Sequence, residues 1–156
     1  MKINVLKVDK MRYQSNKLAS SLVFLSLVFS VVALFTLITY DNFGAGGTLV
    51  RIIPDHRVGI EIGIGIVCML ATFLAAEKVK YYDRTWSFVG VFVLAGINLI
   101  RIFHLPLYAF SKGWIPLAVQ TQTIVEFALS AALLIAAGVI STIKVLWLQA
   151  LAKGAN

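Results

Sequence analysis

Long apolar segments dominate the hydropathy pattern of the chain. Residues 18–40 contain no charged side chain, and at a rise of about 1.5 Å per residue this segment is long enough to cross a hydrocarbon core of about 30 Å. Three more apolar segments follow, at about 58–76, 85–110 and 116–148. The pattern predicts an all-α fold, in which residues 1–156 form a single integral membrane domain of four transmembrane helices.

The first apolar segment follows a basic stretch, as the hydrophobic part of a signal peptide does. Its length exceeds the usual 7–15 residues, and no clear A-x-A cleavage site comes after it. We therefore expect this segment to remain as the first membrane span.

The distribution of Lys and Arg predicts the orientation of the helices. With four crossings, both termini and the loop between the second and third spans share one side, whereas residues 41–57 form an outer loop on the other. Cytoplasmic loops carry an excess of basic residues, so both termini are expected in the cytoplasm. Ten basic residues fall on this side (Lys2, Lys7, Lys10, Arg12, Lys17, Lys78, Lys80, Arg84, Lys144 and Lys153) and three on the opposite side (Arg51, Arg57 and Lys112).

Composition agrees with a membrane location and argues against a nucleic-acid partner. The chain is 60% hydrophobic and 13% charged, about half the charge of a soluble domain. A net charge of +7 would suit nucleic-acid binding, but the basic residues cluster beside apolar segments, where anionic lipid and the insertion machinery recognise them. The expected location is the cytoplasmic membrane and the first partner is the lipid bilayer.

Two charged residues inside the predicted spans require an explanation, because a charge at the centre of a membrane helix costs about 2.5–3.5 kcal/mol on insertion scales. Arg101 lies in the third span and Glu126 in the fourth. If the hairpin turns around Gly113 and Trp114, both residues lie at about the same depth, so we expect an ion pair. Its role is either a static salt bridge between the two helices or a gated pair on a substrate or proton path.

Polar residues extend from each charge along one helix face. Asn98, His104 and Tyr108 lie at i−3, i+3 and i+7 from Arg101, which places all four on one stripe. Gln122 precedes Glu126 by one turn, and the second span contributes Glu61. These residues predict either a polar binding pocket open to the outside or ordinary polar contacts between helices.

Small residues recur at four-residue spacing on two spans. Gly59 and Gly63 form a G-x-x-x-G motif on the second, and Ala128, Ala132 and Ala136 follow each other on the fourth. Such spacing lets helix backbones approach closely, so we expect these residues to form helix-packing faces.

The residues that could carry catalysis are few, and no catalytic residue is assigned. A haem would need axial ligands, for which the chain offers only His56 and His104, with no further motif beside them. The single cysteine, Cys68, cannot form an intrachain disulfide or a cysteine metal cluster. No cofactor and no bound metal are expected.

These patterns favour a non-catalytic accessory or structural subunit that binds a membrane partner complex through its small-residue faces. The expected protein partner is another membrane protein; a homo-oligomer would instead fit the alternative. The alternative is a small oligomeric transporter or channel that uses the pair Arg101 and Glu126 together with Glu61. A redox or other membrane enzyme is the third possibility.

The predicted topology can be tested with a reporter that is active only in the cytoplasm. Fusions at Lys80 and Asn156 should be active, whereas fusions at Gly46 and Lys112 should be silent, because the chain crosses the membrane between these positions. Equal activity at Asn156 and Gly46 would contradict four crossings.

Overall fold

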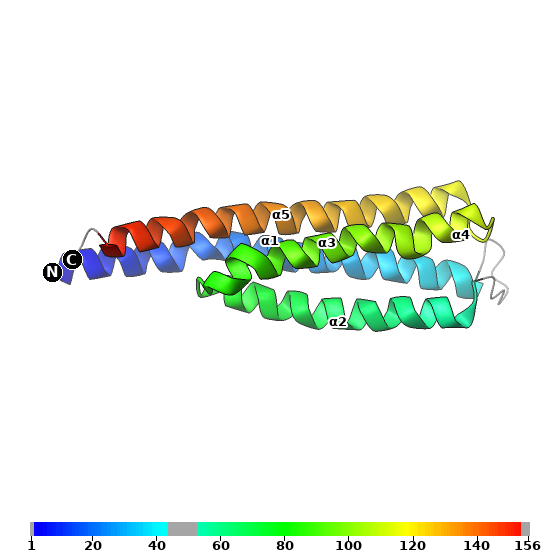
Figure 1. The fold of residues 1–156 in the computed structure, drawn as a ribbon, viewed down its shortest axis with the longest axis horizontal. Coiled ribbons are helices and arrows are strands. Elements are labelled where there is room, and N and C mark those ends of the chain that lie inside the picture. Colours follow the sequence, from blue (N-terminus) through cyan, green and yellow to red (C-terminus); the bar gives the residue numbers. More distant parts are fainter. Residues whose placement is uncertain (1, 44–52, 154–156) are drawn as a thin grey trace.

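A computed structural model describes the backbone of residues 2–43 and 53–153, and the side chains of 16–41, 53–54 and 56–150. Four helical rods in these ranges run alternately up and down, side by side (Figure 1). The third rod is composite, since two π-helical segments interrupt it. In chain order the elements are α1 (Lys2–Phe43), α2 (Asp55–Lys80), then η1 (Trp86–Gly90), α3 (Val91–Ile102), η2 (Phe103–Leu107) and α4 (Tyr108–Ser111) in the third rod, and α5 (Leu117–Lys153).

All four rods are long and apolar enough to cross a membrane, which confirms the four predicted helices. The candidate spans are Asn16–Asp41, His56–Lys80, Trp86–Ser111 and Leu117–Ala150. The largest difference is at the second span, which was predicted to end near residue 76 but continues to Lys80. Lysines in a last helical turn interact favourably with the helix dipole, so Lys78 and Lys80 extend the helix instead of ending it.

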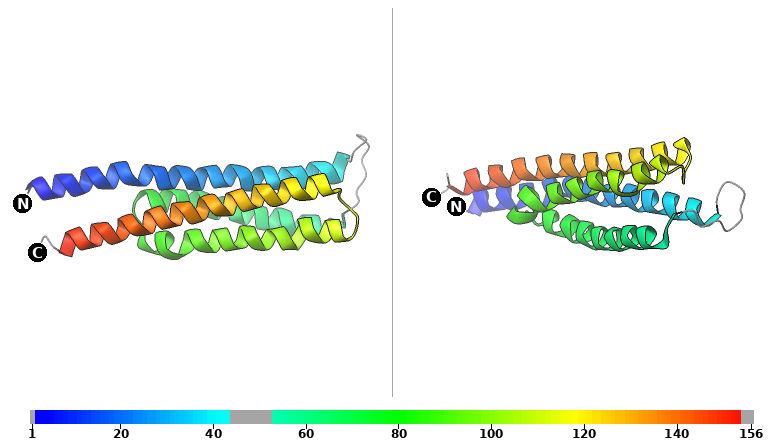
Figure 2. Two further views of the ribbon diagram at one scale, coloured as in Figure 1. Left: turned by 90° about the horizontal axis from the view of Figure 1, so that it is seen from above. Right: turned by 45° about the vertical axis from the view of Figure 1, so that its right-hand side comes forward.

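The first and last helices project beyond the other two at the end that carries both termini (Figures 1 and 2). With 42 and 37 residues, α1 and α5 are about 63 and 55 Å long. A bilayer core of about 30 Å accounts for only part of that length. The opposite end of the bundle, where α1 ends and α5 begins, is called the distal end below.

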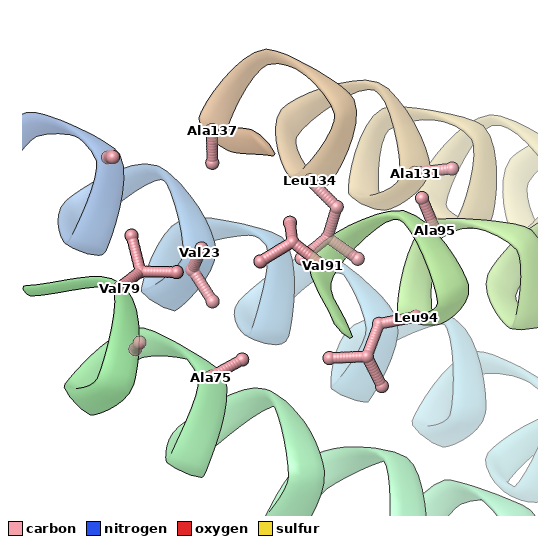
Figure 3. Packing of buried hydrophobic residues seen from close by; sticks show 11 residues of the cluster. Val23, Ala75, Val79, Val91, Leu94, Ala95, Ala131, Leu134 and Ala137 are labelled. Carbon is pink, nitrogen blue, oxygen red and sulfur yellow. The ribbon is translucent and has the colours of Figure 1, made fainter. Parts of the chain in front are cut away.

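Buried residues recur every three or four positions, as in a left-handed helical bundle. In α2 this pattern joins Glu61, Gly65, Cys68, Thr72, Ala75 and Val79. At the end nearer the termini, small and branched apolar side chains from all four rods form one core cluster, and Figure 3 shows nine of them by name: Val23, Ala75, Val79, Val91, Leu94, Ala95, Ala131, Leu134 and Ala137.

The small residues expected to form helix-packing faces lie outside the core of the bundle. Gly59 and Gly63 are exposed, with no atom within 4 Å of where a Cβ would lie. Exposed positions also hold the three alanines of the fourth span, Ala128, Ala132 and Ala136. The two glycines lie two residues from a buried position, about 200° around the helix axis, and each alanine lies one residue from a buried position, about 100° around it. Both stripes therefore lie on the outside of the bundle.

Two short turns connect the rods with the same hydrogen-bond pattern. At Gly113 (φ +72°), the backbone N–H of Trp114 donates to the carbonyl of Ala109 (2.9 Å) and that of Gly113 to Phe110 (2.8 Å), which is a Schellman motif. At the other end, Tyr82 (φ 60°) takes the same left-handed position after α2. The turn around Gly113 lies where the sequence predicted it.

The contact between α3 and α5 can be tested at Gly138, where an added Cβ would lie 2.8–3.1 Å from three atoms of the Phe92 ring. Gly138→Val should lower the free energy of unfolding by about 1–3 kcal/mol because the ring must move. Gly96→Val, where no atom lies within 4 Å, should change it by about 0.5 kcal/mol or less. Unfolding by SDS in mixed micelles, followed by circular dichroism, measures both, and equal losses would contradict this packing.

Candidate functional site

A buried arginine organises the polar centre of the bundle. Arg101, in α3, is 1% exposed, and its Nε donates to Glu61 Oε1 of α2 at 2.6 Å. Its Nη1 donates to Ser30 Oγ of α1 at 2.8 Å and to Asn98 Oδ1 at 3.3 Å. The Phe127 ring of α5 lies 4.4 Å from the guanidinium carbon. All four rods therefore contact this one cation.

Glu61 connects Arg101 to a histidine. Its second oxygen, Oε2, lies 3.2 Å from His104 Nδ1. The His104 side chain is 28% exposed, whereas that of Glu61 is 1% exposed. The carboxylate is thus buried between a permanent cation and a titratable ring that reaches the surface of the bundle.

Hydrogen bonds continue from Arg101 across the bundle. Asn98 Nδ2 donates to Ser130 Oγ of α5 at 3.0 Å, and Ser130 Oγ donates to the carbonyl oxygen of Ser26 of α1 at 2.8 Å. Asn98 and Ser130 are 3% and 0% exposed. Among the described side chains, Arg101 Nη2 is buried without a hydrogen-bond partner, so one nitrogen of this network can still donate.

A glycine makes room for the guanidinium. A Cβ at Gly65 would lie 3.5 Å from Arg101 Nη2 and 2.7 Å from Leu34 Cδ2. A larger residue here would displace Leu34 and narrow the space beside Arg101. Gly65, and neither Gly59 nor Gly63, is therefore the glycine of this helix that permits close packing within the chain.

The expected pair between Arg101 and Glu126 is wrong, because the partner of Arg101 is Glu61. Residues adjacent on a helix point about 100° apart, and on α5 it is Phe127 that faces Arg101. Glu126 turns toward α1, where it accepts a hydrogen bond from Thr36 Oγ1 (3.3 Å), and it accepts a second one from Gln122 Nε2 of its own helix (3.0 Å). The structure thus divides the predicted site residues between two polar clusters.

Tyr108, which was expected on the same helix stripe as Arg101, also lies away from the polar centre around Arg101. Its ring centre is 3.7 Å from the guanidinium carbon of Arg57 and 5.5 Å from the centre of the Trp114 ring. Between Arg101 and Tyr108 the helix passes through η2, whose i→i+5 bonding and internal Pro106 alter the register of the following residues. Arg101 and His104 meet at Glu61 and Asn98 bonds to Arg101, whereas Tyr108 belongs to the distal end.

The sequence interpretation missed the contributions of the first helix. Ser26, Ser30 and Thr36 provide oxygen atoms to the two clusters. The signal lay in a core-like repeat of small residues on the first span, at positions 19, 23, 26, 30 and 33. Serines at such positions face the bundle, where they have polar partners.

The described residues leave little free space beside Glu61. A cavity of about 10 Å³ lies beside Glu61, lined mainly by Leu34, Leu37, Ile53 and Leu105, and this volume holds about one water molecule. Within the described residues, no group of three or more His, Cys, Asp or Glu side chains is placed to bind a metal ion.

Comparisons of the chain with protein families, with curated proteins and with solved structures find no match.

The pairing of Arg101 can be tested by a double-mutant cycle. Arg101→Leu or Glu61→Leu alone should lower the free energy of unfolding by about 3–5 kcal/mol, because each leaves a buried charge unpaired, whereas the double variant should be close to the wild type. SDS titration in mixed micelles measures all three proteins.

The matched control is the cycle of Arg101→Leu with Glu126→Leu. Its two losses should add within about 0.5 kcal/mol, as for residues without a shared partner. If Glu126→Leu, and not Glu61→Leu, recovers the stability lost in Arg101→Leu, then Arg101 pairs with Glu126, as the sequence predicted.

Proposed function

We propose that the chain is an integral protein of the cytoplasmic membrane, with both termini in the cytoplasm, that acts as a non-catalytic accessory subunit. Its partner is another membrane protein. The observation that carries the proposal is the exposure of two small-residue stripes: Gly59 with Gly63 on α2, and the alanines from Ala128 to Ala136 on α5.

The two glycines of the α2 stripe lower the stability of this helix in the isolated chain. Glycine inside a helix is less favourable than alanine by about 1 kcal/mol, and neither Gly59 nor Gly63 has an atom within 4 Å of its Cβ position that would explain it. A second helix packed on this face would benefit from both, because small residues allow close backbone contact in a membrane. The α5 stripe offers the same kind of surface.

The interior of the bundle supports a scaffold role. Arg101 has hydrogen-bond partners on α1, α2 and its own helix, and the ring of Phe127 on α5 lies beneath it. Moving any rod would separate a buried charge or polar group from its partner, which is costly in an apolar medium. Such a bundle presents fixed outer faces to a partner.

One observation favours a transporter as a second candidate. Glu61 lies between Arg101 and a partly exposed His104, so a proton could pass between the surface of the bundle and a buried carboxylate. Purified protein in liposomes would then move an ion or a solute. His104→Gln is the suitable variant, because it removes the ring that would carry the proton and leaves the Glu61–Arg101 pair in place. Loss of flux in this variant, with normal folding, would make transport the favoured function.

The subunit proposal predicts that bulk on the exposed stripes affects assembly and not folding. After purification in mild detergent from cells that contain the natural neighbours, the wild type should carry a stoichiometric membrane partner. Gly63→Leu and Ala132→Leu should each reduce the recovered partner by about tenfold, because a Leu separates the two surfaces. Neither change should lower the free energy of unfolding of the isolated protein by more than about 0.5 kcal/mol. Gly63→Leu should raise it by up to about 1 kcal/mol, because it removes a glycine from the interior of a helix.

Gly96→Leu is the matched control, since it adds the same bulk to α3 at another glycine with no atom within 4 Å. It should leave the recovered partner unchanged. A lone homo-oligomer in place of a stoichiometric partner, or equal losses in all three variants, would contradict the proposal.

A further inference from the structure

Two cations share one aromatic ring at the distal end. The guanidinium carbon of Arg57 lies 3.7 Å from the centre of the Tyr108 ring, and the Lys112 ammonium lies 5.7 Å from the same centre. The Trp114 ring meets the Tyr108 ring edge-on, with centres 5.5 Å apart. Arg57 comes from the start of α2, whereas the other three residues surround the turn after α4.

The fold fixes this cluster. The backbone N–H of Lys112 donates to the carbonyl of Tyr108 at 3.2 Å, and the N–H of Trp114 donates to that of Ala109 at 2.9 Å. Arg57 is held at the first turn of α2, where its N–H donates to the carbonyl of Pro54 at 2.9 Å. These hydrogen bonds fix the backbone of the cluster, and the contacts with the Tyr108 ring bring its side chains together.

Within the described residues, no acceptor occupies the guanidinium N–H groups of Arg57. A guanidinium stacked on a ring uses its face, whereas its five N–H groups point outward in its own plane. Among the described side chains, neither Arg57 nor Lys112 has a carboxylate within 4 Å, in contrast to Arg101 with Glu61 and Lys80 with Glu77. The cluster therefore has two positive charges and a forked donor with no counter-charge from the described residues.

The cluster lies at the level where the membrane surface would be. Arg57 is the second residue of the candidate span His56–Lys80, and Lys112 directly follows the span Trp86–Ser111. Tyr and Trp concentrate at this level in membrane proteins. Phospholipid phosphates lie at the same level, and a phosphate is the group that an Arg fork binds with two parallel hydrogen bonds.

We infer that Arg57, Lys112 and the Tyr108 and Trp114 rings form a binding site for the headgroup phosphate of an anionic phospholipid. Arg57 donates to the phosphate oxygens, Lys112 supplies the second charge, and the two rings flank the glycerol region. The inference rests on the proposed membrane location, but not on the proposed partner.

The experiment uses the fluorescence of Trp114 in vesicles. Trp86→Phe and Trp147→Phe leave Trp114 as the single tryptophan of the background protein. This protein is reconstituted in phosphatidylcholine with increasing fractions of phosphatidylglycerol, and one of the two lipids carries bromine atoms high on its chains to quench nearby tryptophan. Relative quenching gives the preference of the Trp114 site for phosphatidylglycerol.

We expect a preference for phosphatidylglycerol in the background protein. Arg57→Gln and Lys112→Gln should each reduce it by up to about fivefold, since one basic residue near a membrane surface is worth about 1 kcal/mol. Lys80→Gln is the matched control, because it removes the same charge at the other end of α2, and it should retain the preference. Circular dichroism and gel filtration verify that each variant is folded.

Three results would overturn the inference. Equal quenching by the two lipids in the background protein would show that no headgroup is selected, and a preference that survives in both Gln variants would show that these cations do not select it. Loss of the preference on adding millimolar inorganic phosphate would assign the site to a soluble anion. Absence of quenching by either lipid would contradict the membrane location itself.

Discussion

A permanently charged guanidinium in an apolar interior is the constraint on which this structure depends. Arg101 cannot lose its proton, so the bundle must supply a counter-charge and acceptors at its centre. Glu61 supplies the charge, and Ser30 and Asn98 supply oxygens. Gly65 makes room for the group. Because these residues come from α1, α2 and α3, with Phe127 of α5 completing the site, one side chain fixes the register of all four rods.

This interior has consequences for the surface. Once the core positions hold the polar network and the small apolar cluster, other small residues have no packing role inside the chain, and Gly59, Gly63 and the α5 alanines face outward. The charged residues outside the Arg101 network are separated from it in the same way. Glu126 binds neutral partners at the α1–α5 seam, and Arg57 stacks on Tyr108 at the distal end. The residues proposed to bind an external ligand or partner thus lie outside the polar network around Arg101.

Hydropathy predicted the four helices well, because an apolar stretch of about 20 residues has few other solutions. Most of the polar residues that the structure brings together were also identified, because they stand out within apolar segments. The sequence could not predict how each helix is rotated about its own axis, and therefore which residues face the neighbouring helices. Glu126 was a candidate partner for Arg101 because both residues lie at about the same depth in the bundle, but it is the next residue, Phe127, that faces Arg101. The π-helical segment before Tyr108 rotates this residue away from the stripe that contains Arg101. The serines of α1 were overlooked because hydropathy does not distinguish a buried Ser from an exposed one.

The turn after α2 places the two buried charges on neighbouring rods of one hairpin. In the proposed membrane location, Glu61 would leave the ribosome before Arg101. Alone in the bilayer, it would carry the insertion penalty of a charged side chain, about 2.5–3.5 kcal/mol, until Arg101 follows. Tyr82 in its left-handed conformation, with the hydrogen bonds from Tyr82 and Asp83 back to α2, reverses the chain within a few residues. During synthesis, the second and third rods would therefore be best suited to enter a membrane together, as a neutral pair.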